Sequence, residues 1–286
     1  MANYVTDDGI CLRVTDFSET SQIVGMFTRR HGLVPLIAKG AKRASKKNVM
    51  SGPLDLLTGG EVVFVPAKGG GENGTQLGTL AAWELSDHRT ALRGNLMGLN
   101  AAMMCAEVTA HLMMPLDPHE ELFGELEAAL ELLGDAGGNA AKGDERAEMG
   151  RILVAYVKAA LSSAGYWPQL DACMACGKVV GAGDMQMRFS VGGGGVFCGG
   201  VAGCYGEGGG MTMGVPGNVV VGLSRLALPT GLKAHPPERA ADVGALAVAL
   251  EMLLAQVEGV SDKGVRTRGG VKEMLGNSKT ENRHLE

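Results

Sequence analysis

Apolar residues recur at every second position near the start of the chain, where Ile10, Leu12 and Val14 are separated by Cys11 and Arg13. A period of two places alternate side chains on opposite faces of an extended chain, and it therefore predicts a β-strand. Further apolar runs bounded by polar turns predict four more strands, at 23–27, 34–37, 61–65 and 77–85. Five short strands in succession favour a small barrel over residues 1–86.

From residue 87 onward the apolar period lengthens to that of an α-helix. Leu92, Leu96, Leu99 and Met103 share one helical face, and the pattern continues until Pro115 ends it. Similar patterns predict three more helices, at about 119–133, 145–164 and 237–257. We therefore expect an α+β protein in which an N-terminal five-stranded barrel, 1–86, is followed by an α-helical domain, 87–286.

The charged residues are unevenly distributed. The chain is acidic, with 26 Lys and Arg against 31 Asp and Glu, yet it has no acidic residue between Thr20 and Leu54. That window holds seven cations, here called the basic island: Arg29, Arg30, Lys39, Lys42, Arg43, Lys46 and Lys47. Such a cluster is typical of a surface that binds a polyanion, most plausibly nucleic acid. Charge alone fits a solvated basic face without a partner equally well.

The barrel and the basic island together indicate a class of fold. The five-stranded barrel that binds oligonucleotides is the OB-fold, and the basic island would cover its second and third strands and the loop after them. Phe17 and Phe27 are the aromatic residues near the basic island that could stack on bases. Aromatic side chains at such positions more often fill the barrel core, so we expect contacts with phosphate to dominate.

Four of the six cysteines fall within a short stretch: Cys173, Cys176, Cys198 and Cys204. Two thiolates separated by two residues can bind one Zn²⁺, and a second pair completes a tetrahedral structural site. The second pair is separated by five residues, three of them glycine, where two are usual. Disulfides, which a reducing cytoplasm disfavours, and four unrelated thiols are the alternatives. The remaining two, Cys11 and Cys105, lie in apolar segments and are expected to be buried.

Several segments resemble the bacterial RecO family in order and spacing: 12–21, 27–33, 38–43, 77–80, 92–96, 165–168 and 171–177. Membership would imply an OB-fold barrel and a zinc-finger module at about 166–214. It would also imply a non-catalytic DNA repair protein that binds single- and double-stranded DNA and anneals complementary strands. The partners implied are RecR, the acidic tail of single-strand-binding protein (SSB) and, indirectly, RecA.

Two further residues are candidates for contacting that tail. Arg151 and Lys158 stand seven residues apart on the helix predicted at 145–164 and therefore share a face, beside Val154 and Leu161. Cations next to apolar side chains suit a peptide that ends in acid and a large apolar residue. Solvated charges flanking a core stripe are the alternative reading.

Catalytic functions find little support in the sequence. The Gly177-Lys178 pair is followed by Val179 rather than the Ser or Thr of a phosphate-binding loop, and the six histidines are scattered. Asp16 and Glu19 lack the further carboxylates of a nuclease metal site. A metal-dependent DNA-processing enzyme and a zinc-containing regulator that binds only proteins remain the alternatives. The N-terminus lacks the features of a signal peptide, and we expect a cytoplasmic protein.

Overall fold

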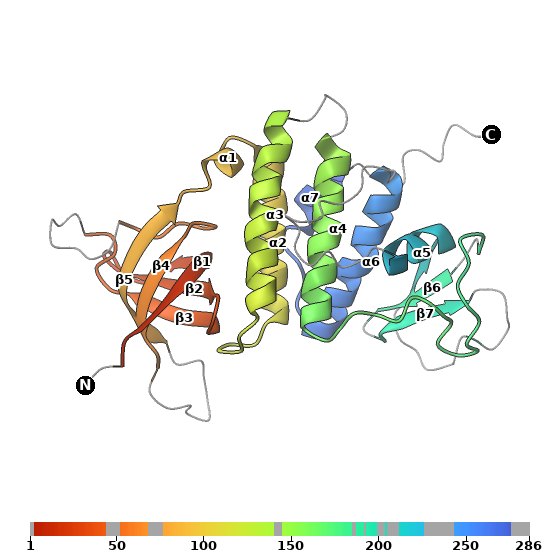
Figure 1. The fold of residues 1–286 in the computed structure, drawn as a ribbon, viewed down its shortest axis with the longest axis horizontal. Coiled ribbons are helices and arrows are strands. Elements are labelled where there is room, and N and C mark those ends of the chain that lie inside the picture. The colour runs from red at the N-terminus through yellow and green to blue at the C-terminus, as the bar shows by residue number, and fades with distance from the viewer. Residues whose placement is uncertain are drawn as a thin grey trace.

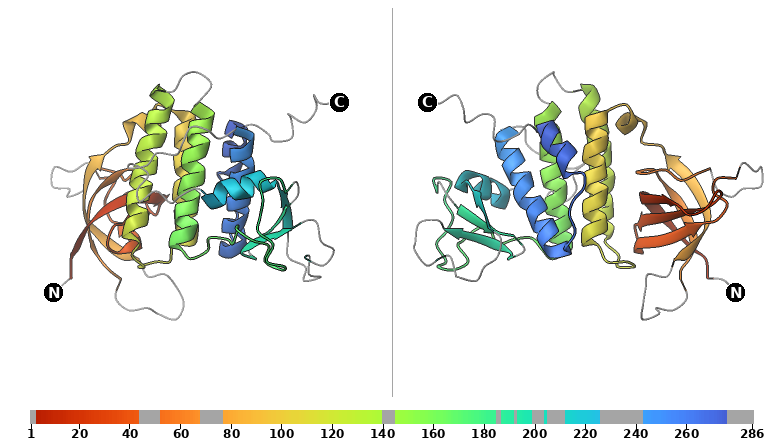
Figure 2. Two further views of the ribbon diagram at one scale, coloured as in Figure 1. Left: turned by 45° about the vertical axis from the view of Figure 1, so that its right-hand side comes forward. Right: turned by 180° about the vertical axis from the view of Figure 1, so that it is seen from behind.

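The computed structural model describes residues 3–43, 52–67, 77–139, 145–184, 187–191, 193–198, 204, 212–225 and 243–275. The described elements form a row of three parts (Figures 1 and 2). A β-barrel lies at one end, a group of long helices forms the middle, and a small sheet lies at the other end. The candidate DNA-binding and metal-binding residues therefore lie at opposite ends of the molecule.

The barrel is closed by five strands in the order β1-β2-β3-β5-β4. The strands are β1 (Val5–Asp16), β2 (Gln22–Thr28), β3 (Gly32–Ala38), β4 (Gly59–Val65) and β5 (Gly78–Asp87). β3 and β5 pair in parallel, whereas the other neighbours are antiparallel. Buried side chains such as Met26, Phe64 and Trp83 fill the interior. The prediction of an OB-like barrel followed by helices is thus confirmed.

The outer face of β1 and β2 is covered at one end only. Ile10, Leu12 and Phe27 point away from the barrel interior and are buried in the core that the helices share. The ring of Phe27 lies 5.8 Å from that of Phe123, centroid to centroid. Strand pairing shifts between Cys11 and Arg13, so Leu12 is an extra residue in β1. This bulge lets Leu12 face the helices while Arg13, the next residue, is exposed and Val14 packs against the barrel core.

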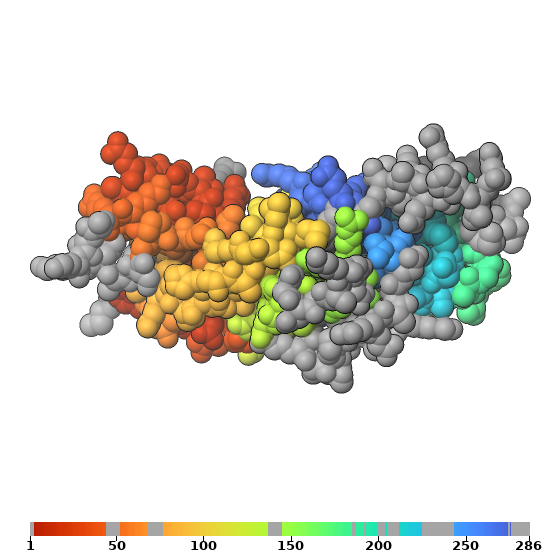
Figure 3. Space-filling view, turned by 90° about the horizontal axis from the view of Figure 1, so that it is seen from above, coloured from red at the N-terminus to blue at the C-terminus, as the bar shows by residue number. Residues whose placement is uncertain are grey.

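The helix predicted from residue 92 is divided in two, which corrects the sequence-based expectation. The structure has α1 (Thr90–Arg93) and α2 (Leu96–Leu112), with Gly94 and Asn95 between them. The Asn95 side chain accepts hydrogen bonds from the amides of Met97 and Gly98 and so caps α2. An apolar period does not register such a break because α1 and α2 both contribute to the core. From above, β5, α1 and the start of α2 form one strip from barrel to helices (Figure 3).

The other long helices agree with the apolar pattern. They are α3 (Glu120–Asn139), α4 (Glu145–Ser163) and α6 (Val243–Ser261), and the predicted start of α6, at 237–242, lies outside the described residues. Two short helices were not predicted, α5 (Gly217–Arg225) and α7 (Arg268–Leu275). With 9 and 8 residues, they are shorter than the window of about 11 residues in which a helical period is read.

α6 is long and apolar enough to cross a membrane, with a mean hydropathy of 1.7, and it alone is so among the described helices. It packs beside α4 in the middle of the row (Figure 1), and most of its apolar side chains are buried there. Its Glu251 forms ion pairs with Arg268 and Lys272 of α7. Burial against neighbouring helices explains the apolar composition of α6, so we interpret it as a core helix rather than a membrane span.

Candidate nucleic-acid interface and metal site

The fold separates the basic island into two groups. Arg29 and Arg30, here called the turn pair, lie in the turn between β2 and β3. Lys39, Lys42 and Arg43, here called the β3-end group, follow the far end of β3. At about 3.3 Å per residue, the length of β3 places the two groups roughly 20 Å apart. Lys46 and Lys47 lie outside the described residues.

The turn pair is engaged with acidic residues of the protein itself. Arg29 donates to Glu127 of α3 at 2.9 Å and to Asp8 at 3.4 Å. Its guanidinium carbon also lies 4.5 Å from the centre of the Phe123 ring. Arg29 therefore fastens the barrel to the helices, and these contacts reduce the positive charge that it offers to a ligand.

Asp7 holds the second arginine of the turn pair. Its side chain is 1% exposed and accepts from the amide and Nε of Arg30, at 2.9 and 3.2 Å. The Nδ1 atom of His31 lies 2.6 Å from Oδ2 of Asp7, the oxygen that also accepts from the Arg30 amide. Burial raises the pKa of Asp7, but the hydrogen bonds from His31 and Arg30 outweigh burial and hold the pKa below its usual value of 3.8.

The lowered pKa makes the contribution of Asp7 dependent on pH. Because the carboxylate is the favoured form in the folded protein, the interaction stabilises the fold above pH 3.8 and is lost as the pH falls below that value. We expect Asp7→Asn to reduce the free energy of unfolding by about 1–3 kcal/mol at pH 7. In urea titrations, the difference from wild type should shrink as the pH falls below 3.8. A difference that stays constant with pH would contradict this account, and Asp8→Asn, at the exposed neighbouring residue, is the control.

The β3-end group lies next to the loop between β1 and β2. Lys39 and Arg43 are exposed, and Lys42 pairs with Asp16 at 2.5 Å. The amide of Lys42 donates to the Thr20 carbonyl at 3.2 Å, which joins the two loops. Cations are therefore gathered at this end of the barrel, on a backbone held in place by hydrogen bonds.

Two phenylalanines near the basic island have different surroundings. Phe27 is fully buried, as expected for a core residue, whereas Phe17 in the β1–β2 loop is 60% exposed. The expectation that Phe17 fills the core is therefore wrong, because the strand ends at Asp16 and the loop carries Phe17 past the barrel. Arg13 is also exposed on this side. Arg13 was not included in the basic island because it precedes the window without acidic residues. Its spacing of two residues from Thr15 could have placed it on the outer face of β1.

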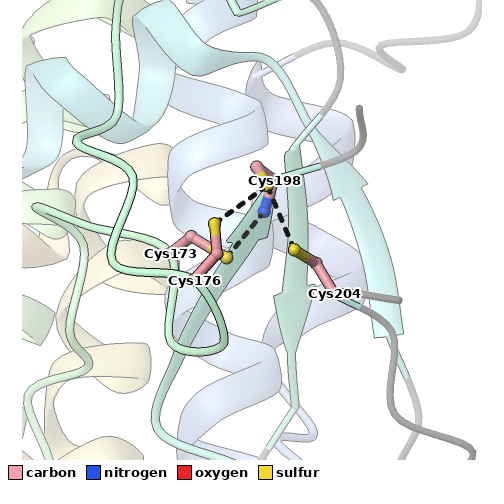
Figure 4. Close-up of side chains that lie close together, drawn as sticks. All are labelled: Cys173, Cys176, Cys198 and Cys204. Carbon is pink, nitrogen blue, oxygen red and sulfur yellow. Dashed lines mark hydrogen bonds between the residues drawn. The ribbon is translucent and has the colours of Figure 1, made fainter. Parts of the chain in front are cut away.

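The four clustered cysteines meet at the other end of the molecule. All four sulfur atoms lie within 4.8 Å of one another and point toward a common centre (Figure 4). The Sγ atom of Cys198 lies 3.6 Å from that of Cys176 and 3.5 Å from that of Cys204. These separations are too long for disulfides, whose S–S bond is about 2.05 Å. They are close to the ~3.8 Å edge of a tetrahedron of sulfurs about 2.3 Å from one metal ion.

Three short strands support the cysteine cluster. β6 (Met187–Ser190) lies between β7 (Gly195–Cys198) and β8 (Thr212–Val215) in this sheet. Cys198 is the last residue of β7. The Gly177 amide donates to the Cys173 carbonyl at 2.9 Å, and Gly177 has a φ of +70° that favours glycine. This tight turn brings Cys176 back beside Cys173. The wide spacing before Cys204 does not keep its sulfur from the cluster.

The surroundings of the thiols agree with a cation at their centre. Burial raises the pKa of Cys173, but backbone amides, that of Cys198 first, donate to its sulfur and lower the pKa to about 6. A hydrogen bond to Cys198, followed by burial, raises the pKa of Cys204 to about 12. Thiolates this close repel one another, so all four ionise together only around a positive ion. The four cysteines could therefore hold a metal ion, whereas burial raises the pKa of Cys11 to about 12 and leaves it an inert thiol.

Comparison with known proteins supports the same architecture. The family described as "Recombination protein O N terminal" matches residues 1–89, and "Recombination protein O C terminal" matches residues 93–212. DNA repair protein RecO of Anaeromyxobacter dehalogenans is 34% identical over 194 residues, which cover 68% of this chain and 69% of that protein. The chain belongs to the RecO family. DNA repair protein RecO of Rhodopirellula baltica is 32% identical over 189 residues, covering 66% of this chain and 64% of that protein.

The candidate tail-binding residues of this RecO-family chain are not on its surface. Arg151 and Lys158 are 3% and 6% exposed. Arg151 donates to Glu148 at 2.7 Å, and Lys158 Nζ lies 4.9 Å from the centre of the Trp167 ring. The alternative that they are solvated charges is therefore wrong. Burial also lowers the pKa of Lys158.

Other chemistry is sparse in the described part of this RecO-family chain. There, the four cysteines form the one group of three or more His, Cys, Asp or Glu residues whose ligand atoms converge as a metal site requires. Asp16, considered as a nuclease ligand, instead pairs with Lys42. His31 and His119 each contact an aspartate, Asp7 and Asp117 respectively. The Nδ1 atom of His119 also lies 2.9 Å from Oγ of Ser163, so this ring joins the loop before α3 to the end of α4.

Proposed function

We propose that this RecO-family protein binds single- and double-stranded DNA without cleaving it and anneals complementary strands in recombinational repair. The observation that carries the proposal is the β3-end group, Lys39, Lys42 and Arg43, on an OB-like barrel. We also propose DNA contacts for the turn pair, at the other end of β3, and for Lys46 and Lys47, which lie outside the described residues. We expect the turn pair to contribute less because Arg29 and Arg30 already contact acidic residues.

Phosphate contacts explain how such a surface serves repair anywhere in a genome. Each Lys or Arg that neutralises a phosphate releases a condensed counterion, and this gain in free energy does not depend on base sequence. Binding two complementary strands on cationic surfaces also reduces the repulsion between them. Neither step requires a catalytic residue.

The helical part is proposed to receive the protein partners. In this proposal, residues 1–86 bind DNA, and residues 87–286 contact RecR and the acidic tail of SSB. These contacts would allow RecA to be loaded on SSB-coated DNA in the cytoplasm. Arg151 and Lys158 remain the candidates for the tail. Because both are buried, contact with a peptide requires the side chains around them to move. Zn²⁺ held by Cys173, Cys176, Cys198 and Cys204 would be structural, since four thiolates leave no open position for water.

Salt dependence provides a direct test of the DNA surface. We expect binding of wild type to single strands to weaken linearly with salt on logarithmic axes, by about 0.7 per phosphate neutralised. Replacing Lys39, Lys42 and Arg43 together with Ala should flatten that slope by about 1.4 to 2, the smaller change applying where Lys42 stays paired with Asp16. The change should be equal for unrelated sequences, and annealing should be slower. Stability should change little, because exposed charges rarely contribute more than about 1 kcal/mol.

A matched variant separates the β3-end group from a general loss of charge. Lys263, Arg266 and Lys272, at the far end of the chain, can be replaced with Ala so that three charges are again removed. This control should keep the wild-type slope. A flattened salt slope in the control, together with an unchanged slope in the Lys39, Lys42 and Arg43 variant, would place the DNA site near α7. That result would overturn the assignment of DNA binding to the β3-end group.

The runner-up is a DNA-processing enzyme that requires a divalent metal. Incubating the protein with end-labelled single-stranded DNA and Mg²⁺ distinguishes the two functions, because binding without cleavage leaves the label in full-length strands. Fragments that increase with time, and that a variant of Asp16 and Glu19 no longer produces, would favour the enzyme.

A further inference from the structure

The uncovered part of the barrel's outer face has a consistent composition. Paired positions on β1, β2 and β3 form two rows across this face. One row consists of Arg13, Gly25 and Pro35, and the other of Thr15, Ile23 and Ile37. Ile23 and Ile37 are half-buried and belong to neither apolar cluster of the described residues. The face therefore presents a shallow apolar strip with an exposed arginine at its side.

Two residues extend this face beyond the strands. Phe17 continues the alternation of Arg13 and Thr15 at the end of β1, and Lys39 continues that of Ile37 at the end of β3. Side chains two residues apart in a strand share a face, so Arg13, Thr15 and Ile37 lie on this face, and Phe17 and Lys39 are the first residues beyond the ends of β1 and β3. Both Phe17 and Lys39 are exposed. An aromatic ring and cations thus lie on one continuous surface.

The loop that carries Phe17 is ordered by its own hydrogen bonds. The Phe17 amide donates to the Ser21 carbonyl at 3.0 Å, and the Ser21 amide donates to Ser18 Oγ at 3.1 Å. The Gly40 amide in turn donates to Ser21 Oγ at 3.4 Å. A ring held on such a backbone loses little conformational freedom when a ligand stacks on it.

We propose that this outer face binds single-stranded DNA with a base stacked on Phe17 and with adjacent phosphates on Arg13 and Lys39. Stacking on an exposed ring together with cations along the backbone is how OB-like surfaces hold single strands. The acidic residues nearby are Asp16, which Lys42 neutralises, and Glu19. The cations around the face, which also include Arg43, outnumber them and favour a polyanion over an acidic or neutral peptide.

This inference rests on the proposed DNA binding and adds a preference between two forms of DNA. Bases in a duplex are paired and stacked on their neighbours, so the Phe17 ring cannot reach them. Stacking on Phe17 would therefore strengthen binding to single strands only. Pairing with a complementary strand would remove that contact, so the annealed product would be held less tightly than the substrate.

Replacing Phe17 with Ala tests the stacking. In fluorescence anisotropy at fixed salt, we expect the affinity of Phe17→Ala for oligothymidylate to fall by about 5- to 100-fold, the range that one stacked base contributes. Duplex affinity and the salt slope should not change, because no phosphate contact is removed. Phe17→Trp should restore binding. Tyr4→Ala, which removes another exposed aromatic residue of the barrel domain, is the matched control and should bind as wild type.

A second probe removes the bases instead of the ring. Wild type should bind an abasic strand of the same length and charge less tightly than oligothymidylate, whereas Phe17→Ala should bind both equally. Equal affinity of wild type and Phe17→Ala for oligothymidylate would overturn the inference, and so would an equal loss on single strands and duplex. These outcomes leave the salt slope of the Lys39, Lys42 and Arg43 variant unaffected, so failure of stacking is distinguishable from failure of DNA binding.

Arg13 adds an independent measurement. We expect Arg13→Ala to flatten the salt slope on single strands by about 0.7, the change for one phosphate contact. Arg13 lies beside Gly25, where no side chain competes for its position, and its removal leaves no cavity. A wild-type slope in Arg13→Ala would exclude this face as the path of the backbone.

Discussion

Cys173→Ser is expected to remove the metal ion and to unfold the small sheet of β6, β7 and β8. The protein as purified should contain about one Zn²⁺ per chain, measured by elemental analysis, and the variant should contain close to none. In isolated zinc-finger peptides the metal contributes about 10–16 kcal/mol at pH 7, so a small sheet rarely folds without it. The region around 166–215 should then become sensitive to protease, while the barrel and helices stay resistant.

The other cysteines provide the control for this experiment. Cys11 is buried in the barrel, far from the cluster along the chain, and Cys11→Ala should keep the full metal content. Wild-type protein with far less than one zinc per chain, after purification without chelators, would contradict the metal assignment. Equal metal content in Cys11→Ala and Cys173→Ser would place the ion elsewhere.

Gly32→Ala is expected to destabilise the protein by about 2–5 kcal/mol. Gly32 begins β3 with a φ of +67°, which costs about 1–2 kcal/mol for a residue with a Cβ. A Cβ at this position would also overlap the backbone carbonyl of Asp117, in the loop after α2, and such overpacking costs about 1–3 kcal/mol more. Because Leu33 pairs with Pro115 beside it, the substitution should loosen the barrel from the helices.

Gly40→Ala separates the two causes. Gly40 has a φ of +71°, but a Cβ there would meet only Arg43 Cδ, at an ordinary 3.8 Å. The free energy of unfolding of Gly40→Ala should therefore fall only by the cost of the backbone conformation, about 1–2 kcal/mol. Chemical denaturation of both variants measures the difference, and equal losses would show that the approach of Asp117 has no energetic consequence.

The barrel and the metal site were predictable because their signals are local. The alternation from Ile10 to Val14 correctly predicted the strand β1, although the bulge at Leu12 places Ile10 and Leu12 on one face and Val14 on the other. The spacing of Cys173 and Cys176 fits one tight turn, so it predicted half of the cysteine cluster. The break at Asn95 was not predictable in the same way, because α1 and α2 both bury apolar residues and the period continues across it.

It was less predictable which charged residues face solvent and which pair within the protein, because their partners lie far along the chain. The basic island is continuous in sequence, but a hairpin directs Arg29 toward Glu127 and Lys39 toward solvent. Lys158 resembles a surface cation on its helix, yet Trp167 and Leu223, from outside that helix, enclose it. Residue type and spacing carry no information on such contacts.

The sequence by itself therefore determined the five barrel strands and the long helices, which cysteines cluster, and the RecO family to which the chain belongs. These properties follow from short-range periodicity and spacing. Only the tertiary structure decided that Phe17 is exposed, that the basic island divides into two groups, and that Arg13 is exposed on the outer face of the barrel. The physical reason is that exposure and electrostatic pairing are set by what packs against a residue, and most of those neighbours come from other elements.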